Sequence, residues 1–105
     1  MKKSFGSPID EAKYYRDQMN RNYLTPGEIS EKVGKDRIQV EGTIRLLKLP
    51  VEVQGYLHQG ILQREHGVVL SQVEDVAHCI AWGRRCISEH LSAKTLEILI
   101  KNRLN

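Results

Sequence analysis

The chain has 105 residues and a mass of 12.1 kDa, which suits one domain with its own hydrophobic core. Lys and Arg number 16 against 13 Asp and Glu, and the resulting net charge of +3 comes wholly from residues 1–50. This mildly basic balance permits nucleic-acid binding without demonstrating it. No apolar stretch approaches the roughly 20 residues of a membrane span, and residues 1–8 lack the hydrophobic region of a secretory signal. We therefore expect a cytoplasmic protein without membrane contact.

Helix start and stop signals divide the chain into short segments, and no strand pattern of convincing length interrupts them. In chain order we expect helices over residues 9–22, 26–33, 37–47, 51–58, 63–71 and 74–90, and a last helix after Ser92. Ser7 and Pro8 suit the start of the first helix, and Pro50 ends the third because the residue before a proline disfavours helix. The sequence therefore predicts an all-α fold, a compact bundle of six or seven short helices, with residues 1–6 as an N-terminal tail and 7–105 as one domain.

The second and third helices have the features of a helix-turn-helix. Thr25 and Glu28 form a capping box at the start of the second helix, and Asp36 is expected to cap the third. Ser30 is small enough for a crossing helix to approach closely, and Gly34 suits the left-handed backbone of a tight turn. A plain helical hairpin fits the same pattern, so the pattern alone leaves both interpretations open.

The polar residues of the third helix favour DNA as a ligand. Lys35, Arg37 and Gln39 lie around its N-terminal end, where free N–H groups and the helix dipole attract a phosphate. In a major groove, Arg pairs with guanine and Gln with adenine through two hydrogen bonds each. Arg45 and Lys48 lie near the far end of the helix. We expect Arg37 and Gln39 to contact bases or to lie beside them. Lys35, Arg45 and Lys48 are expected to contact phosphates.

Apolar positions predict which face of each helix is buried, because residues three or four apart share a face. The expected core positions are Val40, Ile44 and Leu47 in the third helix, Val73, Val76, Ala77, Ile80 and Ile87 in or beside the sixth, and Leu96, Leu99 and Ile100 in the last.

The two cysteines and four histidines do not indicate a metal centre. Cys79 and Cys86 are seven residues apart, about 10.5 Å along a helix, so we expect free thiols in place of a disulfide. Cys86 and His90 have the i,i+4 spacing of a metal-binding pair, but no second pair completes four ligands. No nucleophile and base form a recognisable motif, and no glycine loop suits a phosphate, so we expect neither a cofactor nor an enzyme.

Several segments, in order, resemble the DNA-binding domain of ParB-type partition proteins. Residues 24–37 read LTPGEISEKVGKDR and residues 43–50 read TIRLLKLP. The family commonly has LTQEELAERVGKSRSTVANTLRLLKLP in this region. Further segments that resemble the family are PIDEA at 8–12, GIL at 60–62 and LSAKTLE at 91–97, so the resemblance covers about residues 7–100.

This resemblance implies sequence-specific binding of double-stranded DNA, as a dimer, at a palindromic centromere-like site. Such sites mark chromosomes or plasmids for segregation by a ParA-type ATPase, which is expected as a partner only of the full family architecture. The family's CTP-binding N-terminal domain and its C-terminal dimerisation domain match no part of this chain. The chain is therefore expected to be the central domain, as a fragment or a stand-alone relative, and to associate with the nucleoid.

The chain departs from the family at positions that are expected to face a ligand. DRIQ replaces the family's SRST from residue 36, so Arg37 carries over whereas Ile38 and Gln39 differ. Val68 stands where the family has an arginine that supports DNA contact, and Arg64 is the candidate replacement. The family's usual DNA site sequence is therefore not assumed for this chain.

The candidate DNA-binding residues join the helix-turn-helix to the start of the fifth helix. His66 matches a family position there, and a packing or capping role is favoured over direct DNA contact. The full set comprises Thr25, Lys35, Arg37, Ile38, Gln39, Gly42, Thr43, Arg45, Lys48, Arg64 and His66. Two other functions stay open: a transcriptional regulator or nucleoid-occlusion factor that uses the same surface on an operator, and a helical protein-interaction module that does not bind DNA.

Overall fold

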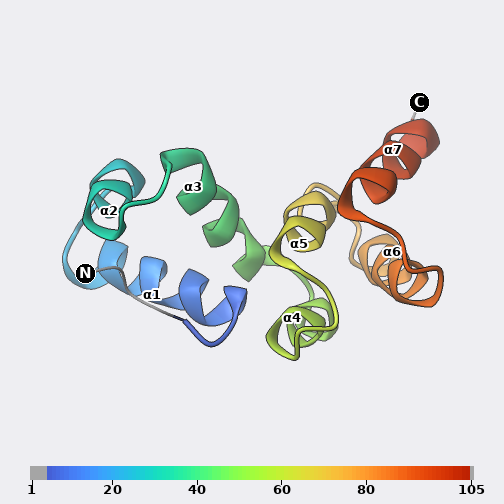
Figure 1. Cartoon of the computed structure of the whole chain (residues 1–105), viewed down its shortest axis with the longest axis horizontal. Coiled ribbons are helices and arrows are strands. Elements are labelled where there is room, and N and C mark those ends of the chain that lie inside the picture. The colour runs from blue at the N-terminus through green and yellow to red at the C-terminus, as the bar shows by residue number, and fades with distance from the viewer. Residues whose placement is uncertain (1–4, 105) are drawn as a thin grey trace.

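A computed structural model describes residues 5–104, and within that range the chain folds into seven α-helices and one 3-10 turn, with no strand (Figure 1). The elements are α1 (Pro8–Arg21), α2 (Pro26–Val33), α3 (Arg37–Arg45), η1 (Leu46–Lys48), α4 (Val51–His58), α5 (Arg64–Leu70), α6 (Val76–Ser88) and α7 (Ala93–Leu104). The predicted all-α fold is confirmed, and the molecule measures 39 × 28 × 20 Å. None of the helices described here is long and apolar enough to cross a membrane. Residues 1–4 of the predicted tail, and residue 105, lie outside the described residues.

Helices α1, α2 and α3 enclose a first core at one end of the molecule (Figure 1). Its buried side chains are Tyr15, Ile29, Val33 and Val40. Phe5 packs against this core, and its ring centroid lies 5.4 Å from that of Tyr14. The packed part of the chain therefore includes Phe5, which was predicted to belong to the tail.

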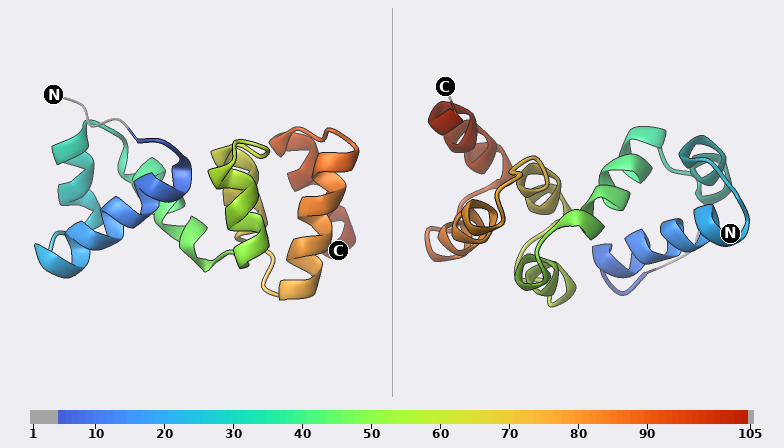
Figure 2. Two further views of the ribbon diagram at one scale, coloured as in Figure 1. Left: turned by 90° about the horizontal axis from the view of Figure 1, so that it is seen from below. Right: turned by 180° about the vertical axis from the view of Figure 1, so that it is seen from behind.

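Helices α4 to α7, together with η1, enclose a second and larger core at the other end of the long axis (Figure 2). Leu46, Val53, Leu57 and Leu96 are fully buried in it. Ile9, from the first turn of α1, also belongs to this second core. Helix α1 therefore packs against both halves of the molecule.

The segment from α2 to α3 follows the predicted capping signals with one exception. Thr25 Oγ1 accepts a hydrogen bond from the Glu28 N–H at 3.2 Å, and the Glu28 carboxylate accepts one from the Thr25 N–H at 3.0 Å. Gly34 ends α2 with a φ of 72°, a left-handed value that glycine adopts without strain. Asp36 directly precedes α3, but its side chain makes no capping hydrogen bond, so the predicted cap is wrong. Asp36 is exposed.

The third helix is shorter than predicted, because the α-helix gives way to the 3-10 turn η1 after Arg45. Val40, Thr43 and Leu46 are buried at intervals of three residues, whereas Ile44 is only partly buried. Leu46 is fully buried and Leu47 only partly, which corrects the predicted buried stripe. Leu49 then takes extended backbone before the proline, as the predicted stop requires.

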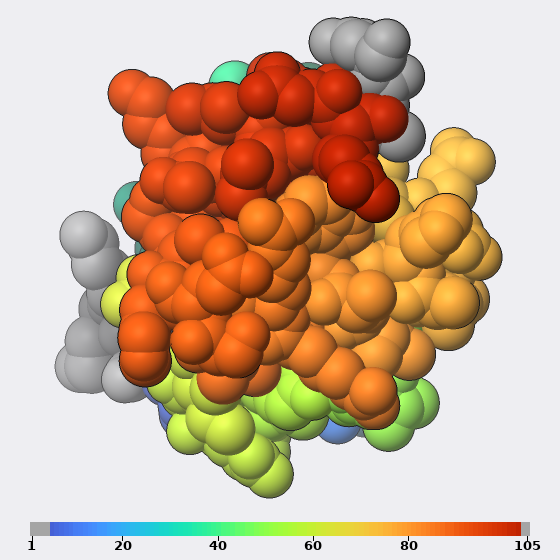
Figure 3. Space-filling model, turned by 90° about the vertical axis from the view of Figure 1, so that its right-hand side faces the viewer, coloured from blue at the N-terminus to red at the C-terminus, as the bar shows by residue number. Residues whose placement is uncertain are grey.

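The buried side of α6 differs from the prediction at Val76 and Ala77. Val76 is 60% exposed and Ala77 is also exposed, whereas Cys79, Gly83 and Cys86 are buried. In Figure 3, α6 and α7 together form the end face of the molecule, so the outer side of α6 faces solvent. The prediction assigned the large aliphatic residues of this helix to the core. The residues buried where α6 packs closely on α4 and α5 are instead small.

The other predicted core positions near the C-terminal end are buried wholly or in part. Leu96 and Ile100 of α7 are buried as predicted, whereas Leu99 is only partly buried. Val73, Ile80 and Ile87 are partly buried and pack against the second core. Both cysteines are free, and burial raises the pKa of each thiol.

Candidate nucleic-acid interface

The helix-turn-helix presents α3 on the outside of the molecule. In Figure 1, α2 is seen nearly end-on whereas α3 lies in the plane, so the two helices cross and do not form an antiparallel hairpin. The N–H groups of Gly34 and Lys35 both donate to the Ser30 carbonyl, at 3.0 and 3.2 Å, which closes the turn. Val40 and Ile44 hold the inner side of α3 against the first core. The opposite side of α3 therefore faces solvent.

Five of the predicted DNA-binding residues are exposed on α3 or directly after it. They are Arg37, Ile38, Gln39 and Arg45 of α3, and Lys48 of η1. We call these five residues the α3 face. The exposed residues of this segment thus include those predicted to contact bases and most of those predicted to contact phosphates.

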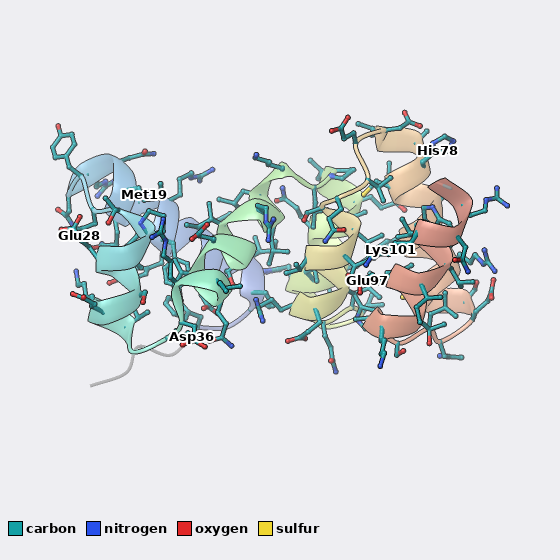
Figure 4. All side chains as sticks on the ribbon, turned by 90° about the horizontal axis from the view of Figure 1, so that it is seen from above. Met19, Glu28, Asp36, His78, Glu97 and Lys101 are labelled. Atoms are coloured by element: carbon teal, nitrogen blue, oxygen red, sulfur yellow. The ribbon has the colours of Figure 1, made fainter. Side chains whose placement is uncertain are left out.

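A hollow of about 260 Å³ borders the α3 face between α3, α5 and α7. Its lining includes Ile38, Gln39 and Arg45 of α3, Arg64 of α5 and Lys94 of α7. Figure 4 shows these three helices along the face seen from above. Arg64 reaches as far as α3, because a Cβ built on Gly42 would lie 3.6 Å from Arg64 Nη1. The predicted residue Arg64 therefore shares a surface with the α3 face.

The acidic side chains on α3 and around this hollow are already paired with cations. The pairs are Arg37–Glu41 at 2.8 Å, Arg64–Glu65 at 3.5 Å and Lys101–Glu97 at 4.0 Å, the last of them labelled in Figure 4. Arg45, Lys48 and Lys94 have no acidic partner within 4.0 Å among residues 5–103. The surface therefore has an uncompensated positive charge, which suits a polyanionic ligand.

Lys35, which was predicted to contact phosphate, is engaged inside the protein. Its Nζ lies 2.8 Å from Oε2 of Glu11, and the same carboxylate accepts a hydrogen bond from the Tyr15 hydroxyl. Glu11 is almost fully buried, so its charge needs this compensation. Burial, and then the hydrogen bond to Glu11, raise the pKa of Tyr15, which keeps the hydroxyl protonated as the donor. The arrangement ties the turn before α3 to α1.

Two other predicted residues have structural positions in the helix-turn-helix. Thr43 is only 1% exposed, so the prediction that its side chain is available to DNA is wrong. It lies three residues after Val40 and therefore on the buried side of α3. Thr25 is exposed, and its hydroxyl is used to cap α2.

His66 holds the start of α5 in place. The Gln63 N–H donates to His66 Nδ1 at 3.2 Å, so Nε2 carries the ring hydrogen and donates to the Leu91 carbonyl at 2.9 Å. Both ring nitrogens are therefore used within the protein, as the packing or capping interpretation expects. These bonds fix the first turn of α5, from which Arg64 extends toward α3.

Lys94 is a cation of this surface that the sequence did not indicate. It lies in the first turn of α7, about fifty residues from α3 along the chain, and lines the hollow beside Gln39 and Arg45. The only local signal was the helix start, where the Ser92 hydroxyl accepts from the Thr95 N–H at 3.1 Å. That signal locates a helix end but does not show which other helix lies next to it.

Comparison with known proteins agrees with this arrangement. The family model described as the ParB HTH domain matches residues 6–105. The chain belongs to the ParB HTH domain family. This ParB HTH domain is 32% identical over 91 residues to the probable chromosome-partitioning protein ParB of Treponema pallidum. It is 30% identical over 91 residues to the nucleoid occlusion protein of Geobacillus kaustophilus, and each alignment covers 87% of this chain.

A solved ParB structure has the same fold as this ParB HTH domain. It is the crystal structure of the C-terminally truncated chromosome-partitioning protein ParB from Caulobacter crescentus, complexed to the centromeric parS site. The TM-score is 0.84 at 32% sequence identity, and the match covers 91% of this chain and 50% of that chain. The present chain spans 28% of the Treponema protein and 32% of the Geobacillus protein, about a third of the curated relatives' length.

Proposed function

We propose that this ParB HTH domain binds double-stranded DNA sequence-specifically, at a palindromic centromere-like site used in chromosome or plasmid partition. The observation that carries the proposal is the likeness of the whole fold to a ParB chain bound to its parS site. The α3 face supports it independently, because its solvent-facing cations have the position that a recognition helix requires.

In this proposal the first turn of α3 reads bases in the major groove. Arg37 and Gln39 are the candidates for hydrogen bonds to base edges. Arg37 is paired with Glu41, but the pair is exposed on one helix, and such pairs contribute only about 0.3–0.5 kcal/mol. Arg37 can therefore leave Glu41 for a guanine at little cost.

Phosphate contacts are assigned to the cations that surround this turn. Arg45 lines the hollow from α3, and Arg64 and Lys94 line it from α5 and α7. Lys48 is exposed on η1. Lys35 is left out of this set because Glu11 engages its ammonium group. His66 contributes by positioning α5, since neither of its ring nitrogens is free.

Selection of bound duplexes from a random pool tests the proposal directly. We expect one enriched sequence with two-fold symmetry, bound by two copies of the chain. The affinity for it should fall steeply as salt rises, because each phosphate contact releases counterions. A pool without an enriched sequence, or an affinity that does not depend on salt, would contradict the proposal.

A single substitution then connects the binding to α3. Arg37→Ala should weaken the selected duplex by about 1–3 kcal/mol and relax the preference at one base in each half-site. Arg85→Ala is the matched control, because Arg85 also forms an exposed i,i+4 pair, with Glu89 at 2.6 Å, but lies on α6. If the two substitutions weaken DNA binding equally, the assignment of α3 to the DNA interface is wrong.

A second candidate role for the same surface is nucleoid occlusion or transcriptional regulation. The similarity to a nucleoid occlusion protein favours this candidate. The positions of the selected sequence in the genome distinguish the roles, since one cluster of sites supports partition and sites within promoters support regulation. In the partition role, a ParA-type ATPase and a location on the nucleoid follow for the full family architecture. A module that binds only proteins would show no affinity for any duplex at low salt.

A further inference from the structure

Ile38 is a large apolar side chain among the five residues of the α3 face, of which the other four are polar or charged. It is 81% exposed, in the first turn of α3 between Arg37 and Gln39. Single exposed aliphatic residues are ordinary on protein surfaces, so exposure alone carries no function. The surroundings of Ile38 are what distinguish it from the other exposed aliphatic residues of this chain.

Ile38 stands on a ridge between two hollows. One is the hollow of about 260 Å³ between α3, α5 and α7, and the other, of about 250 Å³, is bordered by Met19 and Pro26. Ile38 and Arg45 line both hollows. They are seven residues apart, close to two helical turns, so together they form the crest of the α3 face. A convex crest with a hollow on either side has the shape of an element that enters a groove.

The charges beside this crest favour DNA over an apolar protein partner. Arg37 precedes Ile38, Arg45 shares the crest with it, and Arg64 lies in the adjoining hollow. A protein that covered Ile38 with apolar side chains would also remove these cations from water, which is costly without anionic partners. The phosphates of a duplex are anionic partners for these arginines, while the base edges on the floor of the major groove can contact Ile38.

The major groove offers one apolar group for Ile38, the 5-methyl group of thymine. We infer that Ile38 contacts the 5-methyl group of a thymine in each half of the DNA site and determines the base at that position. This inference rests on the proposed function. A β-branched side chain in a helix has one strongly preferred χ1 rotamer, so little conformational freedom is lost in the contact. Serine, which is common at this position in the family, has no apolar group to make the same contact.

Replacement of thymine by deoxyuridine tests the inference without changing the protein. The probe is the duplex selected by the wild-type chain, synthesised with deoxyuridine at one symmetric pair of thymines at a time. This change removes the methyl group and keeps every hydrogen bond of the base pair. At one thymine position we expect about fourfold weaker binding for each methyl group, as the burial of one apolar carbon predicts. All other thymines should tolerate the change.

The Ile38 variants identify the side chain that reads the methyl group. Ile38→Ala should bind the thymine duplex about as weakly as the wild-type chain binds the deoxyuridine duplex, and should not distinguish the two. Ile38→Ser, in a repeated selection, should lose the base preference at that position alone. Val51→Ala is the matched control, because Val51 is 86% exposed on α4, outside the lining of either hollow. Circular dichroism checks that each variant retains its helices.

The outcomes separate this inference from the proposed function. A selected site without a constant thymine would overturn the role of Ile38 while leaving sequence-specific binding intact. So would a wild-type chain that is indifferent to deoxyuridine at every position, or an Ile38→Ala variant that remains sensitive to it. If the wild-type chain selects no duplex at all, both the inference and the proposed function are wrong.

Discussion

Some cations of the interface have an acidic partner within the protein, and others have none in the part of the chain that the structure describes. We expect those without a partner to bind DNA, and those with a buried partner to position the helices. Lys48 is exposed and has no acidic partner within 4.0 Å among the described residues, so its ammonium group is available to a ligand. Lys48→Gln should weaken binding to all duplexes alike and reduce the slope of log affinity against log salt by about 1. Salt titrations of the variant and wild type on selected and unrelated duplexes measure both effects. Lys13→Gln, which removes an exposed lysine from the outer side of α1, should leave the slope unchanged.

Lys35 should behave differently from Lys48, although both are lysines beside α3. Its partner Glu11 is almost buried, so removing the ammonium group leaves Tyr15 as the one side-chain donor to this carboxylate among residues 5–103. We expect Lys35→Gln to lower the free energy of unfolding by about 1–3 kcal/mol, with the salt slope of DNA binding unchanged. Urea denaturation and the same salt titration measure the two quantities. A reduced slope with unchanged stability would show that Lys35 contacts phosphate after all.

Glu52 connects α4 to α6 and makes stability depend on pH. Its carboxylate accepts two hydrogen bonds from Arg84, at 2.7 and 2.8 Å, and one from the Tyr56 hydroxyl. These contacts lower the pKa of Glu52 from 4.5 to about 2, with the Arg84 hydrogen bonds as the largest cause. Because the folded state holds the ionised form, the stabilisation is complete above pH 4.5 and is lost as pH falls toward 2.

The corresponding variant should therefore lose its effect in acid. Glu52→Gln should melt at a lower temperature than the wild type at pH 6, and the difference should shrink steadily between pH 4.5 and 2. Melting temperatures across this range measure it. Glu74→Gln, at an exposed residue in the loop before α6, serves as the control with no such trend. A difference that is equally large at pH 6 and pH 2 would rule out the ionised Glu52 as its source.

At the scale of the elements, capping and stop signals predicted the helices well, whereas the residues that touch between helices were not visible in the sequence. The Thr25–Glu28 capping box, Gly34 and the proline after Leu49 each act within a few residues, so local chemistry determines them. The buried face of α6 depends on how closely α4 and α5 approach, and apolar spacing says nothing about that distance. For the same reason, the sequence indicated Arg37 as an interface residue, because it lies within the helix-turn-helix pattern. It did not indicate Lys94, which reaches this surface only through the packing of α7.

The close approach of α5 to its neighbours rests on Gly67. A Cβ at this position would lie 2.6 Å from Leu46 Cδ2 and 2.7 Å from Leu57 Cδ1, both in the second core. We expect Gly67→Ala to lower the free energy of unfolding by about 1–3 kcal/mol, because the packed leucines must shift. Urea denaturation measures the change.

We expect the substitution of Gly55 by alanine in α4 to stabilise the protein, in contrast to that of Gly67. Nothing lies within 4 Å of a Cβ built there, so Gly55→Ala should raise the free energy of unfolding by about 0.5–1 kcal/mol through helix propensity alone. If both substitutions stabilise the protein equally, α5 does not pack as closely as the structure has it.

At the scale of the whole molecule, α1 and η1 join the two cores into one folding unit. Ile9 packs into the second core whereas Tyr15, on the same helix, packs into the first. Leu46 follows α3 directly and is fully buried in the second core. Ser7 Oγ, at the start of α1, also lies 3.2 Å from Nδ1 of His58 at the end of α4. The α3 face and the cations of α5 and α7 should therefore keep one fixed geometry, which a shared DNA surface requires.

We therefore expect both cores to unfold together, and Trp82 makes this testable because it is the chain's single tryptophan and packs against the second core. Ile29→Ala removes a fully buried side chain from the first core, at a cost of about 2–5 kcal/mol. In a cooperative molecule the urea midpoint of Trp82 fluorescence should fall with that of far-ultraviolet circular dichroism, although Ile29 lies in the other core. Val51→Ala, at an exposed site, should shift neither. An Ile29→Ala variant whose helices melt in part before Trp82 responds would show two independently folding halves, and a DNA surface assembled only on binding.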